Sequence, residues 1–527
     1  MVLLKGNKID YLKADGTKIK TSSGENILLR GFGLGGWLLP EGYMWKLFTK
    51  CDRPRRMENL IEGLCGKKFG TYFWRRYFDS YIRKQDIELI ARQGFNCVRL
   101  PMNARHIDEE VLQRIDQLIS WCREYGVYVI LDMHAAPGGQ TGTNIDDSEN
   151  DTPSLFIEER YQEELISLWG SIAGRYAMEP AVAGYDLLNE PLPDWFSIYN
   201  HMVVPLYRKI IAEIRKADNQ HLIILEGTHW ATNWDIFNEF EDKPVDDNIM
   251  LQFHKYWSSP DEESLKQYTN LGKKLNLPIF MGEGGENNLD WYTGLFPMLT
   301  EQDISWNFWT YKKMDGSNSP VSFPRPEEWS RVAQFIDGEK NLPKELAESI
   351  FNELINNITD KSYINMPVFR ALKREAPLKV PAEYFSGYKV MGKRCPGASL
   401  RSKTPVNIQF VNGSIGEPDY RRYGGEEQPE EERLCIVLEE GGWLEYNFYT
   451  SEDGVFYITV FCIGSQCAAI EMEIDDTNPV TLYPVQNWTN IISPDLLLKK
   501  GDHKLKIKVK ADIVKLQYWR IDCKREE

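Results

Sequence analysis

The stretch VAGYDLLNEP, residues 182–191, decides the fold together with PIFMGEGG, residues 278–285. Each is a short apolar run that carries a carboxylate at its end, Glu190 in the first and Glu283 in the second. A strand that stops in an acid places that acid at the edge of a sheet, where water and substrate can reach it. A single glutamate of this kind is usually only the first solvated residue after a strand, so the interpretation depends on the neighbouring runs.

Six further runs of the same kind lie along the chain. Most are continuous apolar stretches rather than alternating ones, which is typical of parallel strands covered by helices on both faces. The segments between the runs have the hydrophobic periodicity of helices. At residues 111–122, for example, apolar side chains recur at the spacing of one buried helix face. The six runs are LLRGFGLGGW (28–37), FNCVRLPM (95–102), VYVILDMH (127–134), HLIILEG (221–227), NIMLQFHKY (248–256) and ISWNFWTY (304–311).

Eight strand–helix units in about 350 residues predict an α/β fold of the (β/α)₈ TIM barrel class. In such a barrel the carboxyl ends of all strands meet at one rim, which carries the active site. Six polar or aromatic residues fall at these predicted ends, and together they predict one functional site. They are Arg99, His134, Glu190, His254, Glu283 and Trp309.

The composition limits the classes of partner. The chain has 527 residues and a formal charge of −16, which argues against nucleic acid or an anionic membrane surface as a partner. Aromatic residues make up 12% of the chain, and flat aromatic faces are surfaces on which sugar rings stack. The sequence therefore favours a neutral polymer or a small polar molecule as substrate and leaves the oligomeric state open.

The amino-terminal residues hold no long apolar run and no small-residue cleavage site. No stretch approaches the ~18 to 20 apolar residues of a membrane-spanning helix. We therefore expect a protein without a membrane span that is cytoplasmic, or secreted if the sequence is a processed form.

Two domains are predicted. Residues 1–377 form the barrel, with an amino-terminal β-hairpin within residues 6–30 that closes its lower end and final helices at 344–358 and 368–376. After Pro377 the composition becomes rich in Gly, Pro and Lys, and from about residue 405 short alternating strands such as WLEYNFYT follow one another. That pattern predicts an antiparallel β-sandwich at residues 378–527.

The rim residues suit the cleavage of a glycosidic bond. One carboxylic acid protonates the leaving oxygen while a second carboxylate acts on the other face of the sugar ring. Asn189 precedes Glu190 and would offer its amide to a sugar hydroxyl, while Arg99 would hold a neighbouring carboxylate in its charged form. His254 and Tyr256, two residues apart, are expected to reach Glu283 and a sugar hydroxyl, and Trp309 to form the floor of the sugar site.

Neither a metal ion nor a cofactor is implied by these residues. The loop PGGQTG at 137–142 has the glycines of a phosphate-binding loop but lacks the GK[ST] ending and opens no predicted helix. We therefore expect chemistry by side chains alone.

The ordered motifs resemble those of glycoside hydrolase family 5 over residues 25–375. They are RLPM with Arg99, LDMH with His134, LLNEP with Asn189 and Glu190, HKY with His254 and Tyr256, GEGG with Glu283 and NFWTY with Trp309. The resemblance implies that Glu190 is the acid/base and Glu283 the nucleophile of a retaining hydrolysis.

Two further motifs are similar to the exo-acting 1,3-β-glucosidase branch of that family. They are LGGWLLPE (34–41) and DMHAAPGGQTG (132–142), and the likeness implies that Glu41 holds hydroxyls of a terminal glucose. GEGGENN departs from the branch after the nucleophile, which places the linkage in question. The second domain resembles the β-sandwich carbohydrate-binding modules of families 6 and 35.

The sequence thus predicts a retaining β-glycosidase that acts from the chain end on β-glucosides or β-glucan oligosaccharides. Endo-β-glucanase, β-mannosidase and glycolipid glycosidase activities of the same family remain alternatives. A different alternative is a non-catalytic sugar-binding protein, which the presence of both carboxylates and Asn189 disfavours.

Overall fold

The computed structural model describes residues 9–339 and 341–524, which divide into two compact units. The first unit contains residues up to Lys255, Gln267–Gly285 and Asp303–Ile364. The second contains Tyr256–Lys266, Glu286–Gln302 and the residues from Asn365 on. The units therefore interleave along the chain, and the domain boundary placed at residue 377 from the sequence stays a prediction.

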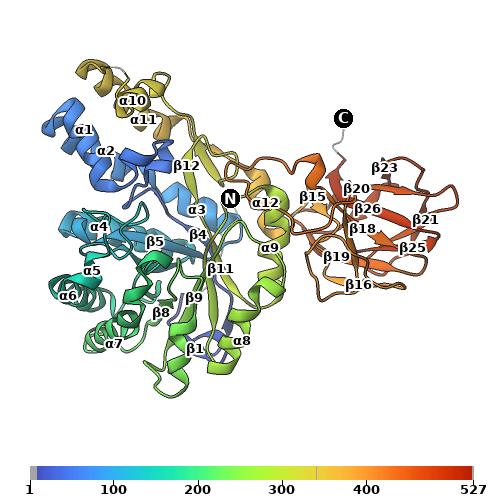
Figure 1. Ribbon diagram of the computed structural model, residues 1–527, viewed down its shortest axis with the longest axis horizontal. Helices are drawn as coiled ribbons and strands as arrows, with labels where there is room; N and C mark the ends of the chain where they lie inside the picture. The colour runs from blue at the N-terminus through green and yellow to red at the C-terminus, as the bar shows by residue number, and fades with distance from the viewer. Residues whose placement is uncertain (1–8, 340, 525–527) are drawn as a thin grey trace. The chain divides into compact units, whose positions relative to one another are not determined.

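The first unit is built on a closed barrel of eight parallel strands, which confirms the predicted fold class (Figure 1). Every residue of β5 and β6 is buried, as the continuous apolar runs indicated. The strands pair in the order β10-β11-β4-β5-β6-β7-β8-β9. Their bounds are β4 Arg30–Gly33, β5 Cys97–Asn103, β6 Tyr128–Ala135, β7 Val182–Asp186, β8 Leu222–Glu226, β9 Ile249–Lys255, β10 Ile279–Gly284 and β11 Ser305–Phe308.

The helix α4, Glu109–Tyr125, shows how sequence sets the helices that cover the strands. Asp108 caps its first turn by accepting a hydrogen bond from the Val111 N–H at 2.9 Å, and Gly126 ends it in a left-handed conformation. Leu112, at the margin of the predicted apolar face, is only half-buried. The other principal helices of this unit are α1 Pro54–Cys65, α2 Lys67–Tyr81, α3 Lys84–Arg92, α6 Glu159–Tyr176, α7 Val203–Ile214, α8 Lys266–Leu275, α10 Trp329–Ile336 and α11 Lys344–Asp360.

A small antiparallel sheet covers the amino-terminal ends of the barrel strands. It consists of β1 Leu12–Asp15, β2 Lys18–Thr21 and β3 Asn26–Ile27. Leu12 and Ile19 are buried in one apolar cluster with Cys97 and Tyr128, the first residues of β5 and β6. This sheet is the hairpin region expected from residues 6–30, of which residues 6–8 lie outside the described part of the chain.

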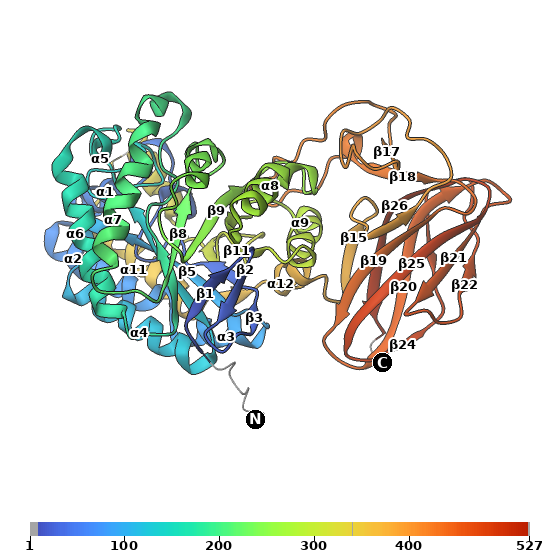
Figure 2. The ribbon, with the colours of Figure 1, turned by 90° about the horizontal axis from the view of Figure 1, so that it is seen from below.

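The second unit contains two antiparallel sheets, consistent with the predicted β-sandwich (Figure 2). Residues alternate between buried and more exposed along β19, as expected for a strand with one face in a core. One sheet holds β15 Leu378–Pro381, β17 Asn407–Phe410, β18 Leu434–Leu438, β20 Gly454–Gly464, β23 Thr489–Ile492, β24 Leu496–Leu498 and β26 Val514–Cys523. The other holds β16 Gly387–Lys389, β19 Trp443–Thr450, β21 Ala469–Ile474, β22 Val480–Leu482 and β25 Gly501–Ala511.

Two helices also belong to this second unit, α9 Leu289–Glu301 and α12 Met366–Lys373. In chain order α9 lies between β10 and β11. Among the described residues, no helix combines the length and the apolar character needed to cross a membrane.

Gly31 on β4 offers a test of barrel packing. A Cβ atom at this position would overlap the backbone carbonyl of Cys97 on β5, so Gly31→Ala should lower the free energy of unfolding by about 3 kcal/mol or more. Gly63 in α1 has open space around it, and Gly63→Ala should instead stabilise by roughly 0.5 to 1 kcal/mol. Urea unfolding followed by tryptophan fluorescence compares the two, and equal midpoints would contradict this account.

Candidate active site

Glu190 and Glu283 lie close together, as their positions at strand ends predicted. Glu283 is on β10, and Glu190 lies four residues after the end of β7. Their side chains are nearly buried, with residue exposures of 7% and 4%. One carboxylate oxygen of each glutamate and one ring nitrogen of His254 lie within 4.8 Å of one another. Two carboxyl groups at this spacing have room for a sugar carbon between them, and retaining glycosidases typically hold theirs ~5 to 5.5 Å apart.

Arg99, fully buried on β5, is the hub of the site. Its Nη1 donates to Glu283 Oε1 at 2.5 Å, and its Nη2 donates to Asn189 Oδ1 at 2.8 Å. Its Nε donates to Asp186 Oδ2 at 2.8 Å. Burial alone would lower the pKa of the guanidinium, but the surrounding carboxylates raise the pKa well above its ordinary value. Arg99 therefore carries a positive charge directly beside Glu283.

A chain of hydrogen bonds orients Asn189. The Nδ2 of Asn189 lies 3.4 Å from His134 Nε2, and His134 Nδ1 donates to Asp132 Oδ2 at 2.7 Å. Burial lowers the pKa of His134 to about 4, so the ring is neutral at neutral pH and its Nε2 accepts from the asparagine amide. The His134 ring also stacks on Trp309, with centroids 5.3 Å apart and an angle of 2° between the planes.

Glu226 is a site residue that the sequence analysis missed. It ends β8, is fully buried, and its Oε2 accepts from the backbone N–H of Glu190 at 2.7 Å. Glu190 has a φ of 43°, in the left-handed region that costs a non-glycine residue free energy. The carboxylate of Glu226 thus anchors the backbone that carries Glu190. The sequence did contain a signal for Glu226, because HLIILEG is also an apolar run with an acid near its end.

His254 lies closer to Glu190 than to Glu283, which was the partner expected from the sequence. Its Nδ1 lies 2.6 Å from Glu190 Oε1 and 3.6 Å from Glu283 Oε2. Burial would lower the pKa of His254, but the negative charges of Glu226, Glu283 and Glu190 raise it well above its ordinary value. A protonated His254 therefore donates a hydrogen bond to Glu190.

Gln140 is a second residue that the sequence analysis quoted without assigning a role. It belongs to the loop after β6, is fully buried, and donates from Nε2 to the carbonyls of His134 at 2.7 Å and Asn189 at 2.9 Å. The loop PGGQTG therefore ties two site residues together.

Trp309, one residue beyond β11, lies close to the glycines of the first barrel strand. Its Nε1 donates to Tyr43 Oη at 2.9 Å, and a Cβ atom at Gly33 or Gly35 would approach its indole ring too closely.

Glu41, predicted to bind sugar, is buried at the start of the short helix after β4. Tyr256 is half-buried just past β9, and its role in the site stays a prediction.

A closed parallel barrel with two buried, adjacent carboxylates at the carboxyl end of its strands is the arrangement of TIM-barrel glycosidases. The family described as "Cellulase (glycosyl hydrolase family 5)" has a sequence model that matches residues 62–315. Residues 62–315 are therefore similar to glycosyl hydrolase family 5, the family whose motifs the sequence resembled.

Several curated proteins are similar to less than half of this chain. A beta-xylosidase from Phanerodontia chrysosporium is 29% identical over 255 residues, 47% of this chain and 52% of the relative. This chain thus spans about half the length of that relative. Endoglucanase C from Acetivibrio thermocellus is 25% identical over 312 residues, 46% of this chain and 88% of the relative. A probable glucan 1,3-beta-glucosidase A from Aspergillus fumigatus is 26% identical over 275 residues, 49% of this chain and 65% of the relative.

Among solved structures, the crystal structure of an endogalactoceramidase aligns with a TM-score of 0.48 at 15% sequence identity. The alignment covers 96% of this chain and 99% of that one.

The lowered pKa of His134 generates a test by acid titration. Between pH 6.5 and pH 4 the unfolded chain binds a proton at this histidine and the folded protein does not, so stability falls as the pH drops through this window. The loss due to His134 is on the order of 3 kcal/mol. In His134→Gln the urea midpoint should fall less over the same pH range. His201→Gln, which changes an exposed histidine, is the control. Parallel curves for wild type and His134→Gln would contradict the assignment.

Proposed function

We propose that the barrel unit hydrolyses β-glycosidic bonds with retention of configuration. The observation that carries this proposal is the carboxylate pair, because one oxygen of Glu190 lies within 4.8 Å of one oxygen of Glu283 and both side chains are nearly buried. The enzymatic names of the three relatives, which describe glycosidases and glucanases, are consistent with it. A non-catalytic sugar-binding protein would have no need for two buried acids held this close.

The two glutamates take different roles because their neighbours differ. Arg99 places a cation 2.5 Å from Glu283, which favours an anion there, and a carboxylate anion is the nucleophile of a double displacement. Glu190 instead directly follows Asn189, the position of the acid/base in the family that the motifs resemble, and its backbone is anchored by Glu226. It is the proton carrier in this proposal.

The proposed reaction has two steps. The Glu283 carboxylate attacks the anomeric carbon while Glu190 gives its proton to the leaving oxygen, so the glycosidic bond breaks and a glycosyl ester forms. A water molecule then attacks the anomeric carbon, Glu190 removes its proton, and the ester bond to Glu283 breaks. The Nδ2 of Asn189, at the long distance of 3.4 Å from His134, is placed to donate to the sugar 2-hydroxyl.

We further propose exo action on β-glucosides. Its support is the burial of Glu41 after β4 and of Gln140 in the loop after β6, since a wall of polar groups beyond the first sugar closes a site to internal chain segments. Endo-β-glucanase action is the principal alternative, and the printed names of the relatives include both an endoglucanase and a 1,3-beta-glucosidase. β-Mannosidase and glycolipid glycosidase activities are further alternatives within the family.

Chemical rescue tests the two catalytic roles. Glu283→Ala should lower kcat by more than about 10³-fold, and added azide should restore turnover with a product of inverted configuration, because the anion fills the vacated face. Glu190→Ala should keep the glycosylation step for aryl glycosides whose leaving group needs no proton. Nuclear magnetic resonance of the azide product reads the configuration. Inversion in Glu190→Ala and not in Glu283→Ala would reverse the assignment.

Product time courses on a soluble β-glucan test exo action. Steady release of glucose from the first time points is the expected result, and an early spread of long oligosaccharides with a rapid fall in viscosity would show endo action. Glu41→Gln should reduce kcat/KM on short glucosides ~10- to 100-fold, because a hydrogen bond to a charged group is lost at the terminal sugar. An endo enzyme would lose little at this position.

A further inference from the structure

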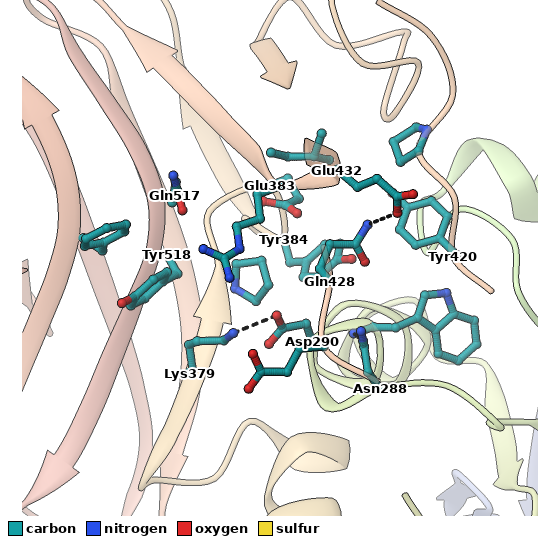
Figure 3. A pocket seen from close by; sticks show the side chains of 17 residues that line it. Asn288, Asp290, Lys379, Glu383, Tyr384, Tyr420, Gln428, Glu432, Gln517 and Tyr518 are labelled. Atoms are coloured by element: carbon teal, nitrogen blue, oxygen red, sulfur yellow. Dashed lines mark hydrogen bonds and ion pairs between the residues drawn. The ribbon is translucent and has the colours of Figure 1, made fainter. Parts of the chain in front are cut away.

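A cavity in the second unit lies between the first turn of α9, the strand β15 and the loop at residues 418–433 (Figure 3). Its volume is about 270 Å³, and Lys379 pairs with Asp290 at 2.8 Å in its lining. Charged side chains of both signs line it, among them Arg433 and Glu427, so the lining selects no single class of ligand. The barrel unit instead contains a series of buried hydrogen bonds that leads from a loop to the backbone of the proposed acid.

The peptide bond between Asn189 and Glu190 is held at both ends. Its carbonyl accepts from Gln140 Nε2 at 2.9 Å, and its N–H donates to Glu226 Oε2 at 2.7 Å. Glu190 has a φ of 43°, and such a backbone conformation persists only where the surrounding structure fixes it. The two bonds therefore fix the backbone from which the Glu190 carboxyl group projects.

The side chain of Gln140 is fully buried and has one orientation that satisfies its amide. Its Nε2 also donates to the carbonyl of His134 at 2.7 Å, and its Oε1 accepts from the N–H of Ala136 at 3.0 Å. Turning the amide over would bring its oxygen against two carbonyls and its nitrogen against an N–H. Gln140 therefore holds Asn189 only if the backbone of its own loop is correctly placed.

Asp146 fixes the backbone of that loop directly after Gln140. It is fully buried, and its Oδ2 accepts from the N–H of Thr141 at 2.7 Å and from the Thr141 hydroxyl at 2.9 Å. The same side chain accepts from the N–H of Gly142 at 3.2 Å and from that of Ser148 at 2.9 Å. One carboxyl group thus receives four donors, three of them from the backbone, and closes the loop onto itself.

The segment that carries Asp146 is anchored to the rest of the barrel unit. The next residue, Asp147, accepts from Asn103 Nδ2, at the end of β5, at 3.0 Å. It also accepts from the N–H of Arg55, in the first turn of α1, at 2.9 Å. Asp146 therefore links an anchored segment to the part of the loop that presents Gln140.

We propose that Asp146 is a positioning residue of the site. It holds Thr141, and with it Gln140, so that the Asn189–Glu190 peptide keeps the Glu190 carboxyl directed at the leaving oxygen. In the described part of the chain the hydrogen bonds of Asp146 stay within its own loop, so it acts through these residues and not on the substrate. This role rests on the proposed function, in which Glu190 is the acid.

Loss of Asp146 should impair one catalytic group and spare the other. Without its bonds the loop loosens, Gln140 releases the peptide, and Glu190 relaxes toward a negative φ that displaces its carboxyl group. Glu283 is held by Arg99 and keeps its place. The damage should therefore appear for leaving groups that need a proton and not for those that depart as stable anions.

Aryl β-glycosides that differ only in the leaving group measure this effect. We compare kcat/KM for a dinitrophenyl and a phenyl glycoside of the sugar that the wild type cleaves, and take their ratio. Asp146→Asn keeps the size of the side chain but turns an amide N–H toward backbone donors. It should lower kcat/KM about 30-fold for the phenyl glycoside and less than about threefold for the dinitrophenyl glycoside. A smaller folded fraction would lower both values equally and leave the ratio unchanged.

Three further variants complete the series. Thr141→Val removes one of the four bonds of Asp146 at nearly constant volume, so the ratio should rise about threefold even if Asp146→Asn does not fold. Gln140→Met should raise the ratio as much as Asp146→Asn does, and the double variant should raise it no further, because the two residues act in series. Asn144→Ala, which alters an exposed residue of the same loop, is the matched control and should keep the wild-type ratio.

Glu190→Ala separates the role of Asp146 from the proposed function, and its ratio should be the highest of all. A raised ratio in Glu190→Ala with wild-type ratios in Asp146→Asn and Thr141→Val would overturn the positioning role and leave the acid assigned. Additive effects of Asp146→Asn and Gln140→Met would overturn the route through Gln140. An unchanged ratio in Glu190→Ala would instead refute the acid itself, and with it both the proposed function and the role of Asp146.

Discussion

The site depends on one buried cation. Arg99 contacts acids from four different strands, namely Asp132 of β6, Asp186 of β7, Glu226 of β8 and Glu283 of β10. An unpaired guanidinium in a water-free interior is very costly, and so is each acid left without it. The carboxylates can therefore be buried only when the barrel has closed around Arg99. The closed barrel and the assembled site therefore depend on the same set of contacts.

Four acids around one arginine leave an excess of negative charge, and this environment raises the pKa values of two of the acids. Burial and the nearby Glu226 raise the pKa of Asp186 to about 7, and burial raises that of Asp132 well above its usual range. His254 adds a positive charge on the other side of Glu226, 3.5 Å from its carboxylate. The buried charged groups of the site thus form one network, and removing any one member changes the electrostatic environment of the others.

Sequence patterns predicted the parts of this protein that have a strong local signal. Continuous apolar runs located all eight barrel strands, and alternation located the main strands of the second unit.

Some site residues were not predicted. Asp132 and Asp186 were missed because each is a single acid inside a run that is otherwise apolar, so the run still predicts only a buried strand. The role of Gln140 was not predictable, since it depends on a loop folding back onto residue 189. The short strands β15 and β16 were missed because they lie in a segment rich in Gly, Pro and Lys, which are poor strand formers. The grouping of α9 with the second unit is a tertiary property that no local pattern encodes.

The left-handed backbone of Glu190 has an evolutionary consequence. Glycine or asparagine would adopt this conformation at lower cost, and either residue would remove the carboxylate that the proposed chemistry needs. Under selection for stability alone, position 190 would drift toward those residues. Under the proposed chemistry, a glutamate in that conformation serves activity at a cost in stability. In a set of homologous sequences, loss of the acid at this position would mark the lineages that have given up catalysis while retaining the barrel.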